Sequence, residues 1–193
     1  MRKRDVIEFF DRMAPQWDAD LIRHDDIIQI ILDNAGVKPG VRVLDVACGT
    51  GVLIPDYLAR GVESVTGVDI SQEMIRIARE KFQQDNVDFI CADVENAPLD
   101  EYDVIMVYNA FPHFPEPEEL IKSLVGHLAI GGTLTVAHGM SRAQIDDHHK
   151  NSASKVSCGL MSEHALAGMM RKYLDVTVKI SNDRMYQVTG VAL

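Results

Sequence analysis

Basic residues and long apolar runs are scarce in this sequence, and each shortage excludes a class of protein. Lys and Arg number 19 against 29 Asp and Glu, which gives a net charge of −10. Such a chain repels the phosphates of nucleic acids, so we expect neither DNA nor RNA as a partner. No apolar run approaches the roughly 18 residues that span a bilayer. The basic residues 2–4 are followed by acidic residues, unlike a secretory signal, so we expect no membrane partner.

Cysteine is also rare, and its three copies have no paired spacing. Disulfide frameworks and most zinc sites need paired cysteines, so Cys48, Cys91 and Cys158 are expected to be reduced thiols in a cytoplasmic protein. The 193 residues suffice for one domain that buries its own core. Whether the chain forms a homodimer is left open by the sequence.

Residues 41–51, VRVLDVACGTG, have the form of a buried parallel strand followed by a glycine turn. Gly49 and Gly51 let the backbone approach a ligand closely, and the helix predicted to start at Val52 presents free N–H groups. Asp45 stands near the carboxyl end of the strand, where ligands of open α/β sheets bind. The stretch therefore predicts a ligand site at this edge of the sheet.

The turn differs from that of dinucleotide-binding proteins. Their G-x-G-x-x-G fingerprint needs a third glycine, and this chain has Ile54 there, which disfavours a nicotinamide-dependent oxidoreductase. Two further predicted strands end in carboxylates, Asp69 in SVTGVDI and Asp93 in VDFICAD, with no basic residue placed nearby for a pyrophosphate. Three carboxylates around one crevice favour a cofactor that is cationic and carries no phosphate.

The motifs VLDVACGTG, GVDIS, ICADVENAPL and YDVIMVYNAF resemble, in this order, those of the class I S-adenosylmethionine-dependent methyltransferases. The resemblance covers residues 41–138. It implies S-adenosylmethionine as cofactor, methyl transfer to a small-molecule acceptor and S-adenosylhomocysteine as product. It also implies that Trp17, in FFDRMAPQWD, helps to cover the cofactor. The other cofactor-binding residues that it implies are Asp45, Ala47, Gly49, Gly51, Asp69, Ile70, Met74, Asp93, Val94 and Asn109.

The resemblance further assigns a part of the cofactor to each strand end. Gly49 and Gly51 are expected to line the methionine portion, and Asp45 to lie near its amino group. Asp69 is expected to bind the ribose hydroxyls. Asn109 is expected to close the crevice beyond the fourth strand. The residues expected to hold the adenine are Ile70, Asp93 and Val94.

Strands and helices alternate along the chain, which is typical of a parallel sheet covered on both faces. The predicted strands are 41–46, 64–70, 87–93, 102–108, 133–138, 176–180 and 185–191, the last two joined through a tight turn. The fold class predicted is α/β: a Rossmann-like, seven-stranded, mostly parallel sheet with helices on both faces and a C-terminal antiparallel hairpin strand.

We expect a single methyltransferase domain, 1–193, with four parts. Residues 1–36 are expected to form an N-terminal helical lid, with one helix ended by Pro15 and a second near 21–35. Residues 41–138 are the cofactor-binding core, 139–161 a substrate-side insertion, and 162–193 the last helix and the β-hairpin. In the insertion, Ser141 and Gln144 have the spacing of a capping box, which predicts a short helix.

Four histidines are candidate catalytic residues. His113 follows the fourth strand, His138 ends the fifth, and His148 and His149 lie on the short helix of the insertion. Histidine titrates near neutrality, so these residues could serve as a general base or orient the substrate. They could equally be scattered histidines of a polar loop. No metal ligand is predicted, because the spacing matches no standard signature.

Two alternatives to a simple methyltransferase stay open. The protein could bind S-adenosylmethionine or S-adenosylhomocysteine without catalysis, since every cofactor position would look the same. It could also be a metal-assisted methyltransferase that uses the cluster His138, His148 and His149. The methyl acceptor is not specified by the sequence.

Overall fold

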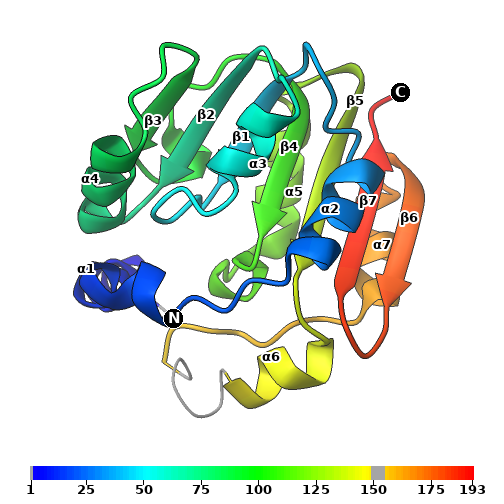
Figure 1. Cartoon of the computed structure of the whole chain (residues 1–193). Coiled ribbons are helices and arrows are strands. Elements are labelled where there is room, and N and C mark those ends of the chain that lie inside the picture. The colour runs from blue at the N-terminus through cyan, green and yellow to red at the C-terminus, as the bar shows by residue number, and fades with distance from the viewer. Residues whose placement is uncertain (1, 149–154) are drawn as a thin grey trace.

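The computed structural model describes residues 2–148 and 155–193, and a seven-stranded sheet forms its centre (Figure 1). The strands lie in the order β3-β2-β1-β4-β5-β7-β6. The first five in sequence are parallel, and β7 is antiparallel to both of its neighbours, which confirms the predicted fold class. The bounds are β1 Arg42–Val46, β2 Ser64–Asp69, β3 Val87–Cys91, β4 Tyr102–Tyr108, β5 Leu128–His138, β6 Asp175–Ser181 and β7 Tyr186–Val191.

Helices cover both faces of the sheet and bury two apolar clusters against it. One face carries α2 (Asp25–Asn34), α3 (Ile54–Ala59) and α4 (Gln72–Lys81), and the other carries α5 (Pro117–Val125) and α7 (Glu163–Met170). Two short 3-10 turns, η1 (Val94–Asn96) and η2 (Phe111–His113), follow β3 and β4. The strand order reverses beside β1, which leaves a crevice at the carboxyl ends of the strands.

Only the first helix of the predicted lid lies at this crevice. Figure 1 shows α1 (Lys3–Asp20) beyond the carboxyl ends of the strands, whereas α2 packs on a face of the sheet. Ile28 and Ile31 of α2 are fully buried in the cluster on that face. Residues 21–36 thus contribute more to the apolar core than to a lid over the crevice.

Pro15 does not end the first helix, and that prediction is wrong. Pro15 removes one backbone donor, but α1 continues past it. Side chains on both sides of the proline attach the helix to the domain. Asp11 accepts a hydrogen bond from Ser71 Oγ at 2.6 Å, and Asp18 accepts one from Thr50 Oγ1 at 2.5 Å. These tertiary contacts compensate for the missing helical bond.

Strand β5 starts earlier than the sequence predicts, at Leu128. The pair Gly131 and Gly132 lies inside the strand and not before it. A Cβ at Gly132 would come within 2.9 Å of the Ala129 oxygen, and Gly131 has a φ of 75°. Glycines therefore permit a bulge here, and the pairing of β4 with β5 shifts register at this point.

The predicted capping box is confirmed at the start of α6 (Arg142–His148). Gln144 N donates to Ser141 Oγ at 3.3 Å, and Ser141 N donates to Gln144 Oε1 at 3.0 Å. Figure 1 places α6 below the carboxyl ends of the strands. The insertion thus begins with a helix that lies, like α1, beyond the carboxyl ends of the strands.

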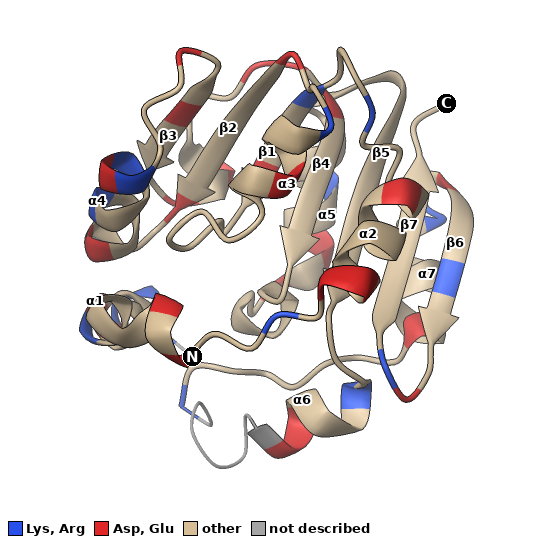
Figure 2. Cartoon of the chain, viewed as in Figure 1, with Lys and Arg blue, Asp and Glu red and all other residues tan. Residues whose placement is uncertain are grey.

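Charged residues of both signs are distributed over the fold. In the view of Figure 2, Lys and Arg are interspersed with acidic residues and form no continuous basic stripe. Within residues 2–148 and 155–193, no helix combines the length and the apolar character needed to cross a membrane.

Candidate active site

A cavity of about 220 Å³ opens at the carboxyl ends of β1, β2 and β4, against α1. The sequence-predicted cofactor residues come together there from five separate segments of the chain. Those that line the cavity are Trp17, Asp45, Ala47, Gly49, Asp69, Ile70, Met74, Asp93, Val94 and Asn109. Of the predicted set, Gly51 does not line it.

Asp45 is a carboxyl group buried in the wall of this cavity. The residue is 3% exposed, and no donor among the described residues hydrogen bonds to its side chain. Burial, and then the charge of Asp69, raise the pKa of Asp45 to about 8. The carboxyl group is therefore largely protonated at neutral pH in the ligand-free protein, and a positive ligand would favour its charged form.

Asp69 holds the glycine turn and the start of α4 together. Its Oδ2 accepts a hydrogen bond from Gly49 N at 2.9 Å, and its Oδ1 accepts one from Ser71 N at 2.8 Å. Burial raises the pKa of Asp69 to about 6, and these two backbone donors oppose the rise. Asp69 thus becomes charged more readily than Asp45 and shapes the turn itself.

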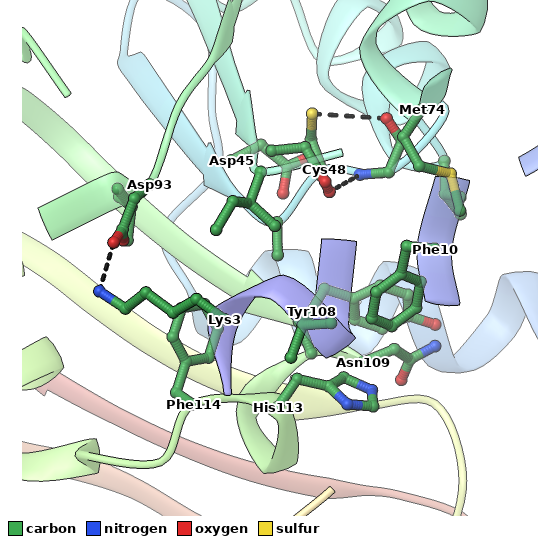
Figure 3. Close-up of a pocket in the computed structure, with 18 of the residues that line it drawn as sticks. Lys3, Phe10, Asp45, Cys48, Met74, Asp93, Tyr108, Asn109, His113 and Phe114 are labelled. Atoms are coloured by element: carbon green, nitrogen blue, oxygen red, sulfur yellow. Dashed lines mark hydrogen bonds and ion pairs between the residues drawn. The ribbon is translucent and has the colours of Figure 1, made fainter. Parts of the chain in front are cut away.

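Lys3, at the start of α1, lies at the end of the cavity that is next to β3. Its ammonium group forms an ion pair with Asp93 (Figure 3). It also donates a hydrogen bond to Glu95 at 3.0 Å. These bonds raise the pKa of Lys3. Sequence reasoning missed Lys3 because its partners lie about 90 positions away and no local pattern links them.

Gly49 and Gly51, the two glycines of the turn, have different structural roles. A Cβ on Gly49 would lie 3.7 Å from Trp17 Nε1, so the bare backbone there faces the cavity and the indole of α1. A Cβ on Gly51 would lie 2.7 Å from the ring of Phe82, and Gly51 has a φ of 83°. Gly51 therefore makes room for core packing behind the turn.

Replacing Gly51 with alanine is expected to lower the free energy of unfolding by about 1–3 kcal/mol, because the Cβ meets Phe82 and the left-handed backbone disfavours a side chain. Denaturant unfolding followed by circular dichroism measures this loss. Gly168→Ala in α7 is the control, since nothing lies within 4 Å of a Cβ there. Equal stability of the two variants would contradict this view of Gly51.

Two residues that line the cavity have left-handed backbones without being glycine. Ala47 has a φ of 54° at the end of β1, and Asn109 has a φ of 53° at the end of β4. Asparagine tolerates this region better than alanine, and such strain concentrates at functional sites. The Asn109 side chain is fixed, because its Oδ1 accepts a hydrogen bond from Gly139 N at 3.0 Å.

His113 is the candidate catalytic histidine that the structure places on the cavity wall. Its Nδ1 lies 2.6 Å from the carbonyl oxygen of Val156. A carbonyl oxygen only accepts hydrogen bonds, so Nδ1 carries the proton, and in the neutral ring Nε2 keeps the lone pair. The ring is thus held in the tautomer that a general base at Nε2 requires.

His138 does not line the cavity. It is 2% exposed and lies on the same side of β5 as Leu134 and Val136, with its ring 6.0 Å from that of Tyr186. Strand alternation turns it towards the α5 and α7 face. This position does not support the predicted catalytic role of His138.

The other two histidines stay predictions. His148 is the last residue of α6, and His149 lies outside the described residues. In the part of the chain that the structure describes, no three His, Cys, Asp or Glu residues are grouped so that they could hold a metal ion. The metal-assisted alternative therefore has no support from the described residues.

Comparison with known proteins identifies the methyltransferase motifs. Residues 43–132 match the sequence model of a family described as Methyltransferase domain. A malonyl-[acyl-carrier protein] O-methyltransferase of Acetivibrio thermocellus is 33% identical over 129 residues, which are 65% of this chain and 46% of that protein. A ubiquinone biosynthesis O-methyltransferase of Coxiella burnetii is 35% identical over 99 residues, which are 49% of this chain and 42% of that protein. The matches span less than half of each relative.

The fold is shared with a solved structure over nearly its whole length. A chain of the Haloferax volcanii complex between the Trm112 methyltransferase activator and a methyltransferase has a TM-score of 0.80 and 20% identity, with 95% of this chain and 97% of that chain covered. Sheet order and crevice define a Rossmann-like fold, and residues 43–132 within it match the methyltransferase family model. In motifs, fold and sequence matches the chain is similar to the class I S-adenosylmethionine-dependent methyltransferases.

Proposed function

We propose that the protein transfers the methyl group of S-adenosylmethionine to a small-molecule acceptor and releases S-adenosylhomocysteine. The observation that carries this proposal is the pair of buried carboxyl groups, Asp45 and Asp69, in the wall of a largely apolar cavity. No basic side chain influences either group. A ligand with an ammonium and a sulfonium group supplies the missing positive charge, whereas a diphosphate would add negative charge.

The residues that line the cavity fit the parts of this cofactor. Asp45 and Gly49 are assigned to the methionine portion, where Trp17 also lies beside the glycine turn. Asp69 is assigned to the ribose hydroxyls, because its carboxylate already stands between the turn and α4. Ala47 and Asn109 form the wall between β1 and β4. The residues assigned to the adenine are Ile70, Met74, Asp93 and Val94.

The chain's own contribution to the reaction is positioning, since the sulfonium of the cofactor is already an activated leaving group. Orientation of two reactants is worth several kcal/mol in well-aligned cases. Helix α1 supplies a wall that limits water, and Asp11 and Asp18 attach that wall to the domain. His113 is the group that can take a proton from an acceptor that must lose one.

We also propose a small-molecule acceptor and a cytoplasmic location. The acidic surface supports the first, as do the two relatives, whose names give a malonyl-acyl-carrier and a ubiquinone-biosynthesis O-methyltransferase. The three free cysteines, Cys48, Cys91 and Cys158, support the second. A homodimer stays a prediction that light scattering of the purified protein tests.

Calorimetry is expected to detect binding of S-adenosylhomocysteine with a dissociation constant on the order of micromolar. The ligand's ammonium group should lower the raised pKa of Asp45, so binding releases a proton at pH 7, and affinity increases from pH 6 to pH 8. Repeating the titration in buffers of different ionisation enthalpy measures the released proton.

Asp45→Asn should abolish this proton release, while Asp183→Asn in the exposed hairpin turn should retain it. The ligand's own amino group titrates equally in both variants, so their difference isolates the carboxyl group. No binding of either S-adenosylmethionine or its product would refute the proposal. Binding without transfer to any acceptor would favour the non-catalytic alternative.

A further inference from the structure

Tyr57 of α3 carries a buried hydroxyl group that has no hydrogen-bond partner in the protein. The residue is 0% exposed and belongs to the apolar cluster on the face of the sheet that carries α2, α3 and α4. Within residues 2–148 and 155–193, no atom forms a hydrogen bond with its oxygen. A buried hydroxyl without a partner lowers stability, and phenylalanine would fill the same place without that cost. The hydroxyl is therefore a candidate for a bond that forms when a ligand binds.

The strand pairing directs Asp45 to the same face of the sheet. Side chains alternate along a strand, so Asp45 of β1 shares a face with Val43, two positions before it. Its neighbour on β4 is Met106. Both Val43 and Met106 belong to the cluster that contains Tyr57. Asp45 and Tyr57 thus lie on one side of the sheet, where α3 packs.

The two side chains are close enough for the charge of one to act on the other. Burial, and then the negative charge of Asp45, raise the pKa of Tyr57. The phenol therefore keeps its proton at any pH at which the protein works. It can act as a hydrogen-bond donor to a carboxylate, which itself can only accept.

Two other proton donors near Tyr57 already have partners. They are the thiol of Cys48 and the hydroxyl of Tyr108. The thiol donates to the carbonyl oxygen of Gly49 over 3.7 Å, and the hydroxyl interacts with the side chain of Asn109. Of these three donors, the Tyr57 hydroxyl is the one without a partner in the described part of the chain.

Ionisation of Asp45 creates the need for such a donor. Its raised pKa keeps Asp45 protonated at neutral pH, and the ammonium group of a bound ligand would favour the charged form. A buried carboxylate is stable only when its oxygens have hydrogen-bond donors as well as a counter-charge. The ammonium group can serve one oxygen from the cavity. The second oxygen then needs a donor from inside the wall.

We propose that Tyr57 is a positioning residue for the ammonium group of the cofactor. Its hydroxyl donates a hydrogen bond to one oxygen of the charged Asp45 and so directs the other oxygen towards the ligand. The proton that leaves Asp45 passes to water. This inference rests on the proposed function, because the ammonium group of the cofactor is what ionises Asp45. The two side chains are not bonded in this structure, so a movement of one or both accompanies binding.

The test compares Tyr57→Phe with Tyr186→Phe by calorimetric titration with S-adenosylhomocysteine at pH 7. Tyr186 is the matched control, because it also has a buried hydroxyl without a partner among the described residues, but it lies in the cluster on the opposite face. We expect Tyr57→Phe to weaken binding about 5- to 30-fold, as for a lost hydrogen bond to a charged group, and Tyr186→Phe to leave it unchanged. Neither variant should have a lower urea midpoint of unfolding without ligand.

Two further measurements show whether the effect passes through Asp45. The probe 5′-methylthioadenosine has the adenosine and the sulfur of the cofactor but no ammonium group, so native protein and Tyr57→Phe should bind it equally. In a double-mutant cycle, Tyr57→Phe should change the affinity for S-adenosylhomocysteine less than about twofold when Asp45 is already replaced by asparagine.

Three outcomes would overturn the inference while the proposed function stands. The first is native affinity of Tyr57→Phe for S-adenosylhomocysteine. The second is an equal loss of affinity for 5′-methylthioadenosine, which would show a general role of Tyr57 in packing. The third is a loss of ligand-free stability in Tyr57→Phe but not in Tyr186→Phe, which would show that the hydroxyl is bonded before the ligand arrives. Absence of S-adenosylhomocysteine binding by the native protein would refute the proposed function itself.

Discussion

Asp69→Asn is expected to weaken the binding of S-adenosylhomocysteine by about 10- to 100-fold. The loss corresponds to about 1–3 kcal/mol, the usual contribution of hydrogen bonds to a charged group. Asparagine has the shape of the native side chain but presents an amide group to one of the two backbone donors that Asp69 now accepts from, Gly49 N or Ser71 N. The turn and the ribose site should therefore be weakened together. Calorimetry at pH 7 measures the change.

A control variant must distinguish the loss of the ligand-binding site from a general loss of structure. Asp88→Asn lies on the neighbouring strand β3, where its side chain is exposed and outside the cavity, so it should bind the ligand as the native protein does. Thermal unfolding of both variants reports whether they are folded at the temperature of the titration. If Asp69→Asn is folded and binds with native affinity, the assignment of Asp69 to the cofactor is wrong.

Asp45→Asn is expected to make the ligand-free protein more stable than the native one at pH 8, and equally stable near pH 4. The pKa of Asp45 is about 8 in the folded protein against an ordinary value of 3.8. A group whose pKa is raised by folding stabilises the protein below its unfolded pKa, and this contribution is lost as the pH rises to the folded pKa. With about 1.4 kcal/mol for each pKa unit, the loss between pH 4 and pH 8 is on the order of several kcal/mol.

Asparagine resembles the protonated carboxyl group and does not titrate, so the variant should lack this part of the pH dependence. Asp69, with a pKa of about 6, adds a smaller loss between pH 4 and pH 6 in both proteins. Urea unfolding at four pH values, with Asp88→Asn as control, measures the difference. A constant difference between Asp45→Asn and the native protein across this range would show that Asp45 is not protonated in the fold.

Local sequence patterns were sufficient to predict the sheet and to single out many of the residues that line the cavity. A strand that ends in a carboxylate and a glycine turn is a continuous stretch of sequence, so Asp45, Gly49 and Asp69 could be found without a structure. Parallel strands bring their carboxyl ends to one edge, which places these stretches together. The structure brings these three residues to one cavity, and their binding of a cofactor stays a prediction.

Contacts between distant residues could not be predicted in this way. The continuation of α1 past Pro15 depends on Ser71 and Thr50, which bond to side chains of the helix from other parts of the fold. The position of His138 was missed for a different reason. Both faces of β5 are buried, as Val136 and Ala137 show. The pattern of apolar residues along the strand therefore did not show towards which face His138 points.

The place of β7 in the sheet has a consequence for synthesis of the protein. This strand comes after β6 in the chain but lies between β5 and β6, with which it pairs on its two sides. A nascent chain that ends before residue 186 therefore leaves the backbone groups of β5 without their neighbour, although the five parallel strands are already made. Such an open edge can join another chain. Chains truncated between residues 138 and 186 should thus aggregate more readily than the full chain.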